Sequence, residues 1–123
     1  MIEPRKTIMV IEDNTEMRSM IAELLYASGY VVYSADDAPS ACRLARTLRP
    51  AAVLCDVKLP TWNGFETAAR LQQDPETRRI PVVLMSGYVE YQEKRPVSGR
   101  WLSKPFTGEE LSNAMQEAVA FRA

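Results

Sequence analysis

The sequence predicts an α/β fold in which a mostly parallel sheet is covered by helices on both faces. Three observations support this prediction: five apolar segments of strand length, helical stripes of apolar residues between them, and capping or helix-breaking residues at the junctions. Strands that alternate with helices are joined by right-handed crossovers, which make the strands parallel. A chain of 123 residues is long enough for one such core and too short for two. We therefore expect a single domain over residues 1–123, with no output domain after it.

The first strand is expected at residues 7–11, a continuous apolar run typical of a parallel strand buried on both faces. A helix follows, capped by Asn14 and ended by Ser28-Gly29. Its apolar positions have the spacing i, i+3, i+4, i+7, i+8 that indicates one buried helix face. They are Met17, Met20, Ile21, Leu24 and Leu25.

The second and third strands are expected at residues 30–34 and 52–56, with a helix between them. Asp36-Asp37 is interpreted as the cap of that helix, and Pro50 ends it. Its apolar stripe consists of Ala38, Ala41, Cys42, Ala45 and Leu48. Cys42 and Cys55 are expected to be reduced and to act as small apolar residues.

The second half of the chain continues the alternation. A helix with the apolar positions Phe65, Ala68, Ala69 and Leu71 ends before Asp74-Pro75, and a fourth strand is expected at residues 80–85. Between residues 86 and 100 the periodicity weakens and breakers occur, so at most a short helix is expected there. A brief fifth strand at 101–103 precedes the last helix, which begins with a capping box from Thr107 to Glu110.

The composition excludes several kinds of function. The chain is 46% hydrophobic and 25% charged, and its 15 basic and 16 acidic residues leave a net charge of −1. That balance predicts no broad attraction to nucleic acid or to an anionic membrane. No signal peptide or membrane span is visible, so we expect a cytoplasmic protein. The absence of histidine excludes imidazole catalysis and leaves oxygen atoms as the metal ligands to expect.

Polar side chains lie where four of the expected strands end: Glu12-Asp13, Asp56, Ser86 and Lys104. Because open α/β sheets bind ligands at the carboxyl ends of their strands, we expect these side chains to converge. Carboxylates about 4 Å apart repel by about 4 kcal/mol at an effective dielectric near 20, so the cluster needs a divalent cation, a proton or the lysine. Taken singly, they could be helix caps, a turn residue and a solvated charge. Their joint placement favours a shared site for phosphoryl transfer.

The order and spacing of these residues are those of a known family. The chain resembles the receiver domain of two-component response regulators, the type that includes the bacterial chemotaxis regulator. Glu12-Asp13 matches the acidic pair after the first strand, and Asp56, 43 residues after Asp13, matches the phosphoacceptor. Ser86, 30 residues further on, matches the switch hydroxyl. The remaining matches are the loop Lys58-Leu59-Pro60-Thr61-Trp62-Asn63-Gly64, the small neighbour Gly87 and the signature Lys104-Pro105-Phe106.

The resemblance implies a five-stranded parallel sheet of order 2-1-3-4-5, the flavodoxin-like arrangement. It further implies that Asp56 accepts a phosphoryl group from a phosphohistidine donor, with Mg²⁺ held by Glu12, Asp13, Asp56 and the backbone carbonyl of Lys58. Lys104 and the Ser86 hydroxyl would stabilise the peripheral oxygens of the transferred group. Apart from this self-phosphorylation and a slow self-dephosphorylation, no enzyme activity is expected.

The chain departs from the family pattern in the segment after Ser86. Only 18 residues separate Ser86 from Lys104, fewer than in the chemotaxis regulator, so the fourth helix is expected to be short or irregular. Residues 81–88 also resemble the Pro-Phe-x-Phe-Ala-Thr-Gly-Tyr motif of an atypical receiver group. Trp101 stands where the family usually has a Tyr or Phe that rotates inward. Both a switching role and a fixed place in a partner-binding surface remain open for it, and its indole N–H needs a partner.

The remaining departure concerns the lifetime of the phosphorylated state. Lys58, two residues after Asp56, and Tyr88, two after Ser86, flank the path along which water would attack the phosphoryl group. The same pair resembles that of slowly hydrolysing phosphorelay receivers. The resemblance therefore predicts a long-lived aspartyl phosphate.

The resemblance also implies partners. The donor would be a histidine kinase or phosphotransfer protein that docks over the first helix, with Asn14, Thr15, Met17 and Arg18 as candidate contacts, although core packing is the more natural role of Met17. Phosphorylation adds about −1.5 to −2 charges. That charge would bias a surface, formed by the region after Ser86, the fifth strand and the last helix, that binds a downstream target. We expect a monomer or weak dimer.

Other interpretations remain open. The chain could be a receiver excised from a hybrid kinase instead of a free-standing regulator. It could also be a degenerate receiver that acts as a phosphorylation-independent interaction module. An Mg²⁺-dependent phosphatase with an Asp nucleophile is disfavoured, because Lys58 occupies the place of the second Asp that such enzymes use as acid and base.

Overall fold

The computed structural model of the chain describes residues 5–87 and 100–120. In these ranges five strands form one parallel sheet in the order β2-β1-β3-β4-β5, which confirms the predicted fold class and strand order. The strands are β1 Thr7–Ile11, β2 Val31–Ala35, β3 Ala52–Asp56, β4 Val82–Ser86 and β5 Arg100–Ser103. The predicted short fourth helix and Tyr88 fall in residues 88–99, outside the described residues.

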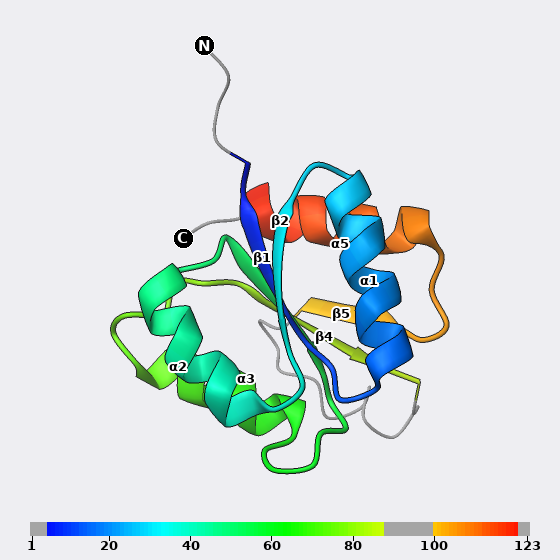
Figure 1. Cartoon of the computed structure of the whole chain (residues 1–123). Coiled ribbons are helices and arrows are strands. Elements are labelled where there is room, and N and C mark those ends of the chain that lie inside the picture. Colours follow the sequence, from blue (N-terminus) through cyan, green and yellow to red (C-terminus); the bar gives the residue numbers. More distant parts are fainter. Residues whose placement is uncertain (1–4, 88–99, 121–123) are drawn as a thin grey trace.

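Helices cover both faces of the sheet (Figure 1). Helices α1, Thr15–Ala27, and α5, Gly108–Ala120, pack on one face, and α2, Ala38–Leu48, and α3, Gly64–Gln73, pack on the other. Side chains of the inner strands β1, β3 and β4 alternate between two cores, so that Ile8 contributes to the α1–α5 core and Met9 to the α2–α3 core. All five residues of β3 are buried, as its continuous apolar run predicted. None of the described helices is long and apolar enough to span a bilayer.

Local capping groups start the helices as predicted. The Asn14 side chain accepts a hydrogen bond at 2.9 Å from the backbone N–H three residues on, and Asp37 does the same at 2.8 Å. That backbone hydrogen bond is the main reason why the pKa of Asp37 lies below its ordinary value. Thr107 and Glu110 bond reciprocally at 3.0 and 2.9 Å, which confirms the capping box.

Some element boundaries and one helix face differ from the predictions. β2 begins one residue later than expected and β4 two residues later. Met20 and Leu24 were predicted to lie on the buried face of α1, but these residues are 44% and 37% exposed. Only Ile21 and Leu25 of the stripe are fully buried, because the sheet and α5 cover a narrower strip of α1 than its apolar pattern suggests. Both cysteines are free, as expected.

The strand register brings the carboxyl ends of the strands to one edge. Ile11 pairs with Cys55, Asp56 with Met85, and Ser86 with Ser103. Asp56 therefore lies at the end of the central strand, with the residues that follow β1 on one side of it and those that end β4 on the other.

Candidate functional site

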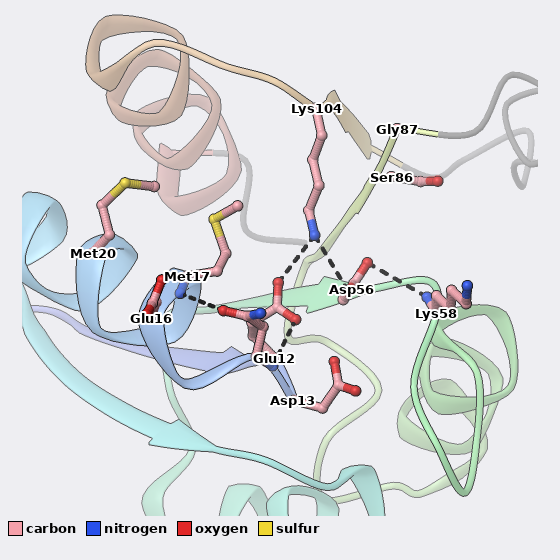
Figure 2. A pocket seen from close by; sticks show the side chains of 11 residues that line it. Glu12, Asp13, Glu16, Met17, Met20, Asp56, Lys58, Ser86, Gly87 and Lys104 are labelled. Atoms are coloured by element: carbon pink, nitrogen blue, oxygen red, sulfur yellow. Dashed lines mark hydrogen bonds and ion pairs between the residues drawn. The ribbon is translucent and has the colours of Figure 1, made fainter.

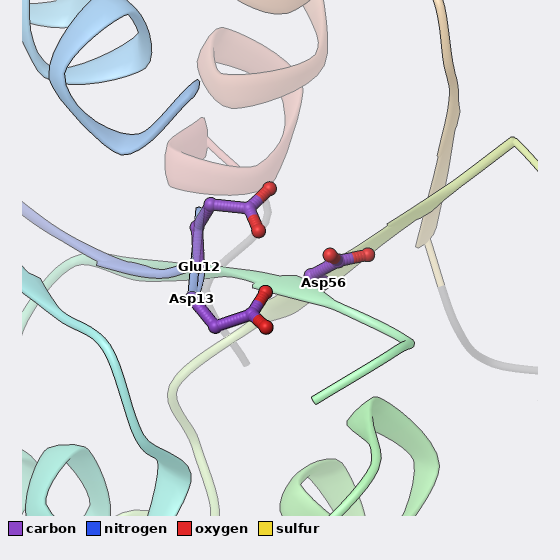
Figure 3. Close-up of side chains that lie close together, drawn as sticks. All are labelled: Glu12, Asp13 and Asp56. Atoms are coloured by element: carbon purple, nitrogen blue, oxygen red, sulfur yellow. The ribbon is translucent and has the colours of Figure 1, made fainter. Parts of the chain in front are cut away.

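Three carboxylates gather at this edge of the sheet. Glu12 and Asp13 follow β1, Asp56 ends β3, and one oxygen atom of each lies within 4.8 Å of one from the others (Figure 3). The three residues differ in exposure: Glu12 is 1% and Asp56 6% exposed, whereas Asp13 is exposed to solvent. The predicted convergence of the acidic residues is thus found in the structure. The site is open on the side of Asp13, where a cation could enter.

Lys104 supplies a positive charge to this cluster from the loop after β5. Its Nζ lies 3.0 Å from Glu12 Oε1 and 3.3 Å from Asp56 Oδ2 (Figure 2). Burial by itself lowers the pKa of Lys104, but the hydrogen bond with Glu12 and the negative charge of Asp56 outweigh burial and raise that pKa above its ordinary value. Lys104 is therefore a cation at neutral pH and offsets part of the repulsion among the carboxylates.

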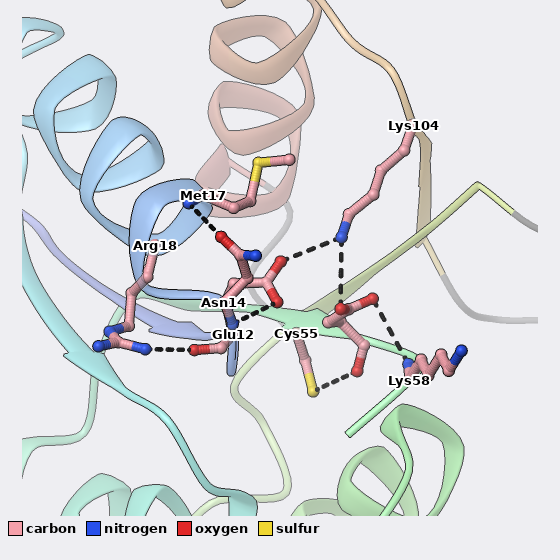
Figure 4. Close-up of polar contacts among 8 residues, drawn as sticks. Glu12, Asn14, Met17, Arg18, Cys55, Lys58 and Lys104 are labelled. Atoms are coloured by element: carbon pink, nitrogen blue, oxygen red, sulfur yellow. Dashed lines mark hydrogen bonds and ion pairs between the residues drawn. The ribbon is translucent and has the colours of Figure 1, made fainter. Parts of the chain in front are cut away.

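Glu12 is held by backbone and side-chain contacts on both sides. The backbone N–H of Asn14 donates to Glu12 Oε2 at 3.3 Å, and the Arg18 guanidinium donates to the Glu12 carbonyl oxygen at 2.8 Å (Figure 4). Asn14 caps α1. The alternative in which Glu12 or Asp13 caps this helix is therefore wrong. From the sequence, Arg18 was predicted only as a candidate contact with the protein that donates the phosphoryl group. Its bond to Glu12 was missed, since no local pattern signals it.

The loop after Asp56 is fixed by Gly64, the first residue of α3. Gly64 N–H donates to the Val57 carbonyl at 2.8 Å, and a Cβ at Gly64 would lie 2.7 Å from the backbone oxygen of Asp56 and 2.8 Å from Val57 Cα. Glycine therefore allows α3 to begin directly against the backbone of the Asp56 strand. The family motif contained this glycine, but the close backbone approach could be seen only in the structure.

Lys58 contacts Asp56 through its backbone. The Lys58 N–H lies 3.4 Å from Asp56 Oδ1, a long hydrogen bond, while its side chain extends away from the carboxylates (Figure 2). The predicted role of the Lys58 carbonyl as a metal ligand stays a prediction.

Ser86 and Gly87 form another wall of the site. Ser86 is 2% exposed, lies at the end of β4 beside Asp56, and its side chain does not point toward Asp56 in Figure 2. A Cβ at Gly87 would meet Lys104 atoms at 3.6 Å, an ordinary contact, so packing does not require glycine there. The switching roles predicted for Ser86, Gly87 and Tyr88 stay predictions.

The carboxylates and Lys104 line a pocket of about 630 Å³. Glu16, Met17 and Met20 of α1 form its rim (Figure 2). Met17 also packs against the α1–α5 core, which confirms the packing role expected for it, while its contact with a donor protein stays a prediction. Glu16 and the exposed Met20 were not among the residues predicted for the site.

Trp101 of β5 lies inward, against α3. Its ring stacks on Phe65 with centroids 6.3 Å apart and planes inclined by 26°. The indole Nε1 is buried, and no hydrogen-bond partner for it occurs among residues 5–87 and 100–120. The partner expected for this N–H is thus not found in that part of the chain, and the ring contributes to the α2–α3 core.

Comparison with known proteins shows the family to which the chain belongs. The family model of the response regulator receiver domain matches residues 8–116, so the chain belongs to the family of response regulator receiver domains. It is 33% identical over 106 residues to the polar-differentiation response regulator DivK of Brucella anthropi, a match that covers 83% of this chain and 86% of that protein.

Two solved structures are similar at 25% identity. The receiver domain of the sensor histidine kinase PA1611 from Pseudomonas aeruginosa, which has a magnesium ion coordinated in its active-site cleft, matches with a TM-score of 0.87 over 95% of this chain and 99% of that one. The chemotaxis response regulator CheY4 of Vibrio cholerae matches with a TM-score of 0.85 over 94% and 99%.

Proposed function

We propose that the chain is a phosphoacceptor receiver in which Asp56 takes a phosphoryl group from a phosphohistidine. The chain has no histidine of its own, so the phosphohistidine must belong to another protein. This donor would be a histidine kinase or phosphotransfer protein, and both proteins would act in the cytoplasm. One observation carries the proposal: Asp56, Glu12 and Asp13 offer oxygens within 4.8 Å of one another, and the Lys104 ammonium lies 3.3 Å from Asp56. Membership of the receiver family supports the same reading.

The three carboxylates fit Mg²⁺, which prefers hard oxygen ligands and keeps several waters. Asp13, Asp56 and the Lys58 carbonyl would hold the ion, and Glu12 would act directly or through a bound water. The magnesium in the PA1611 receiver supports this assignment by analogy. When bound, the ion would neutralise the charge that develops on the phosphoryl oxygens.

In the proposed transfer, an Asp56 carboxylate oxygen forms a bond to phosphorus while the bond from phosphorus to the donor imidazole nitrogen breaks. The imidazole leaves with the electron pair. Lys104 already lies beside Asp56, where its charge would stabilise a peripheral oxygen of the phosphoryl group. Ser86, at the end of the adjacent strand, would turn its hydroxyl toward that group. Together with Gly87, Tyr88 and Trp101 it would alter a surface that a downstream target protein binds.

Phosphorylation is testable by intact mass. After incubation with acetyl phosphate and Mg²⁺, the wild-type chain should gain one phosphoryl group. Asp56→Ala should gain none, because it lacks the nucleophile. The matched control is Asp36→Ala, which removes an exposed carboxylate outside the pocket and should leave the gain unchanged.

An equal mass gain in Asp56→Ala would contradict the assignment of the nucleophile. If the wild-type chain bound neither Mg²⁺ nor beryllofluoride, the degenerate receiver would be the correct interpretation. Steady turnover of a small phosphate ester would instead indicate a phosphatase.

The lifetime of the phosphoryl group provides a separate prediction. We expect Lys58→Asn combined with Tyr88→Ala to speed the loss of phosphate several-fold, because smaller side chains would open the path of the attacking water. The measurement follows the phosphorylated fraction by mass after the donor is removed. Unchanged decay would reject a shielding role for this pair while leaving Asp56 as the phosphoacceptor.

A further inference from the structure

A second pocket lies between α2 and α3, which run side by side on the face of the sheet away from α1 and α5 (Figure 1). Its volume is about 350 Å³. Helix α2 contributes Cys42, Arg43 and Arg46 to its lining, Arg70 comes from α3, and Asp74 and Trp62 lie in the segments that flank α3. We call this pocket the α2–α3 groove. It shares no lining residue with the pocket of Asp56.

The α2–α3 groove is positively charged although the whole chain carries a net charge of −1. Among the described residues, three guanidinium groups and a single carboxylate, that of Asp74, line it. Arg46 Nε lies 2.9 Å from Asp74 Oδ2. Arg43 is exposed and has no carboxylate within ion-pair distance in residues 5–87 and 100–120; its Nη2 lies 3.3 Å from Ser40 Oγ in the same helix. Arg70 is paired as well, with Glu66, so the charge that no ion pair of the described residues balances is that of Arg43. Its nearest influence is on the pKa of Asp37, which the backbone hydrogen bond of that carboxylate lowers most and Arg43 helps to lower.

The guanidinium groups are spread along the groove. Arg46 pairs with Asp74 at the end of α3, and Arg70 pairs with Glu66 in its first turn, at 3.2 Å. Glu66 and Asp74 are eight residues apart, about 12 Å along a helix axis. One compact phosphate would reach only part of this array, whereas carboxylates spaced along a peptide would meet the groups in turn. The planar fork of arginine also suits bidentate contact with carboxylates.

The groove is connected to the loop that follows Asp56. The Arg70 guanidinium lies 3.9 Å from the centroid of the Trp62 ring, and Trp62 belongs to the segment between Asp56 and α3. Arg70 is therefore held in place by both the indole and Glu66. A partner seated in the groove would touch the same loop that provides the Lys58 N–H near Asp56.

We propose that the α2–α3 groove binds an acidic peptide segment of a partner protein, whose carboxylates pair with Arg43, Arg46 and Arg70. The proposal goes beyond the phosphoacceptor function and does not depend on it, since the groove is complete in the unphosphorylated chain.

The first test measures binding of a fluorescein-labelled peptide of alternating glutamate and alanine by anisotropy at low ionic strength. Arg43→Glu should weaken binding by about tenfold or more, because it replaces the unpaired cation with an anion. Arg5→Glu is the matched control: it changes the net charge equally, at an exposed arginine that lies over Tyr26 of α1. Absence of binding, or equal weakening by both variants, would overturn the proposal.

The second test uses Cys42 as a reporter within the groove. Cys42 is half-buried, whereas Cys55 is fully buried, and burial raises the pKa of both thiols. Modification by a maleimide at mildly alkaline pH should therefore occur at Cys42, and the acidic peptide should slow it several-fold in the wild-type chain but not in Arg43→Glu. Protection by pyrophosphate without protection by the peptide would show a phosphate site and overturn the proposal. The peptide should protect Cys42 equally in Asp56→Ala, which cannot be phosphorylated. A loss of peptide binding can therefore be distinguished from a loss of the phosphoacceptor function.

Discussion

Replacing Gly64 with alanine is expected to destabilise the chain by about 2–3 kcal/mol and to slow phosphorylation of Asp56. The added Cβ would lie 2.7 Å from the Asp56 backbone oxygen and 2.8 Å from Val57 Cα, and neither atom belongs to a flexible side chain. Helix propensity alone would favour alanine by about 1 kcal/mol, so the sign of the measured change decides between the two effects. The clash should prevail because α3 would have to move away from the β3 strand end.

Gly108 provides the matched control for this substitution. It is likewise the first residue of a helix that follows a capping residue, but a Cβ there would meet only Leu24 Cδ2 at 3.6 Å. Gly108→Ala should therefore be neutral or slightly stabilising. Urea unfolding of both variants gives the free energies, and the rate of mass gain with acetyl phosphate reports the site. Equal stability of the two variants would show that α3 adjusts without strain.

Replacing Lys104 with methionine is expected to destabilise the metal-free protein by about 3 kcal/mol. Glu12 is 1% exposed, and without the ammonium its charge would face Asp56 and Asp13 with no counter-ion from Lys104. Mg²⁺ should stabilise the variant more than the wild type, because it would then supply the missing charge. Because the pKa of Lys104 is raised, the wild-type advantage should persist below about pH 10 and disappear only as the pH rises through the raised value.

The measurement is urea unfolding in EDTA and in excess Mg²⁺. Lys6→Met, which removes an exposed lysine just before β1, serves as the control and should change stability by less than about 0.5 kcal/mol in either condition. If Lys104→Met were as stable as Lys6→Met in EDTA, the ion pairs of Lys104 would contribute little to folding. An equal response of both variants to Mg²⁺ would argue against the proposed magnesium ligands.

The fold could be predicted largely because its signals are local. A buried parallel strand such as β3 needs a continuous apolar run, and the caps at Asn14, Asp37 and Thr107 act within three residues of themselves. The exposure of Met20 could not be predicted in the same way, because it depends on how much of α1 the sheet and α5 cover.

The gathering of the site residues was also predictable, since parallel strands end at one edge of a sheet. The unequal exposure of the neighbours Glu12 and Asp13 was not, because consecutive residues at a strand end project in different directions. The bond from Arg18 to the Glu12 carbonyl and the fit of Gly64 against Asp56 depend on three-dimensional contacts that no spacing in the sequence encodes.

The partition of the interior into an α1–α5 core and an α2–α3 core has an evolutionary consequence. The inner strands β1, β3 and β4 place neighbouring side chains in different cores, so substitutions on one side of the sheet need little compensation on the other. A lineage could therefore acquire or lose a binding partner on the helices of one side while the opposite side drifts independently. Only the residues at the carboxyl ends of the strands, which lie between the two cores, would have to stay unchanged.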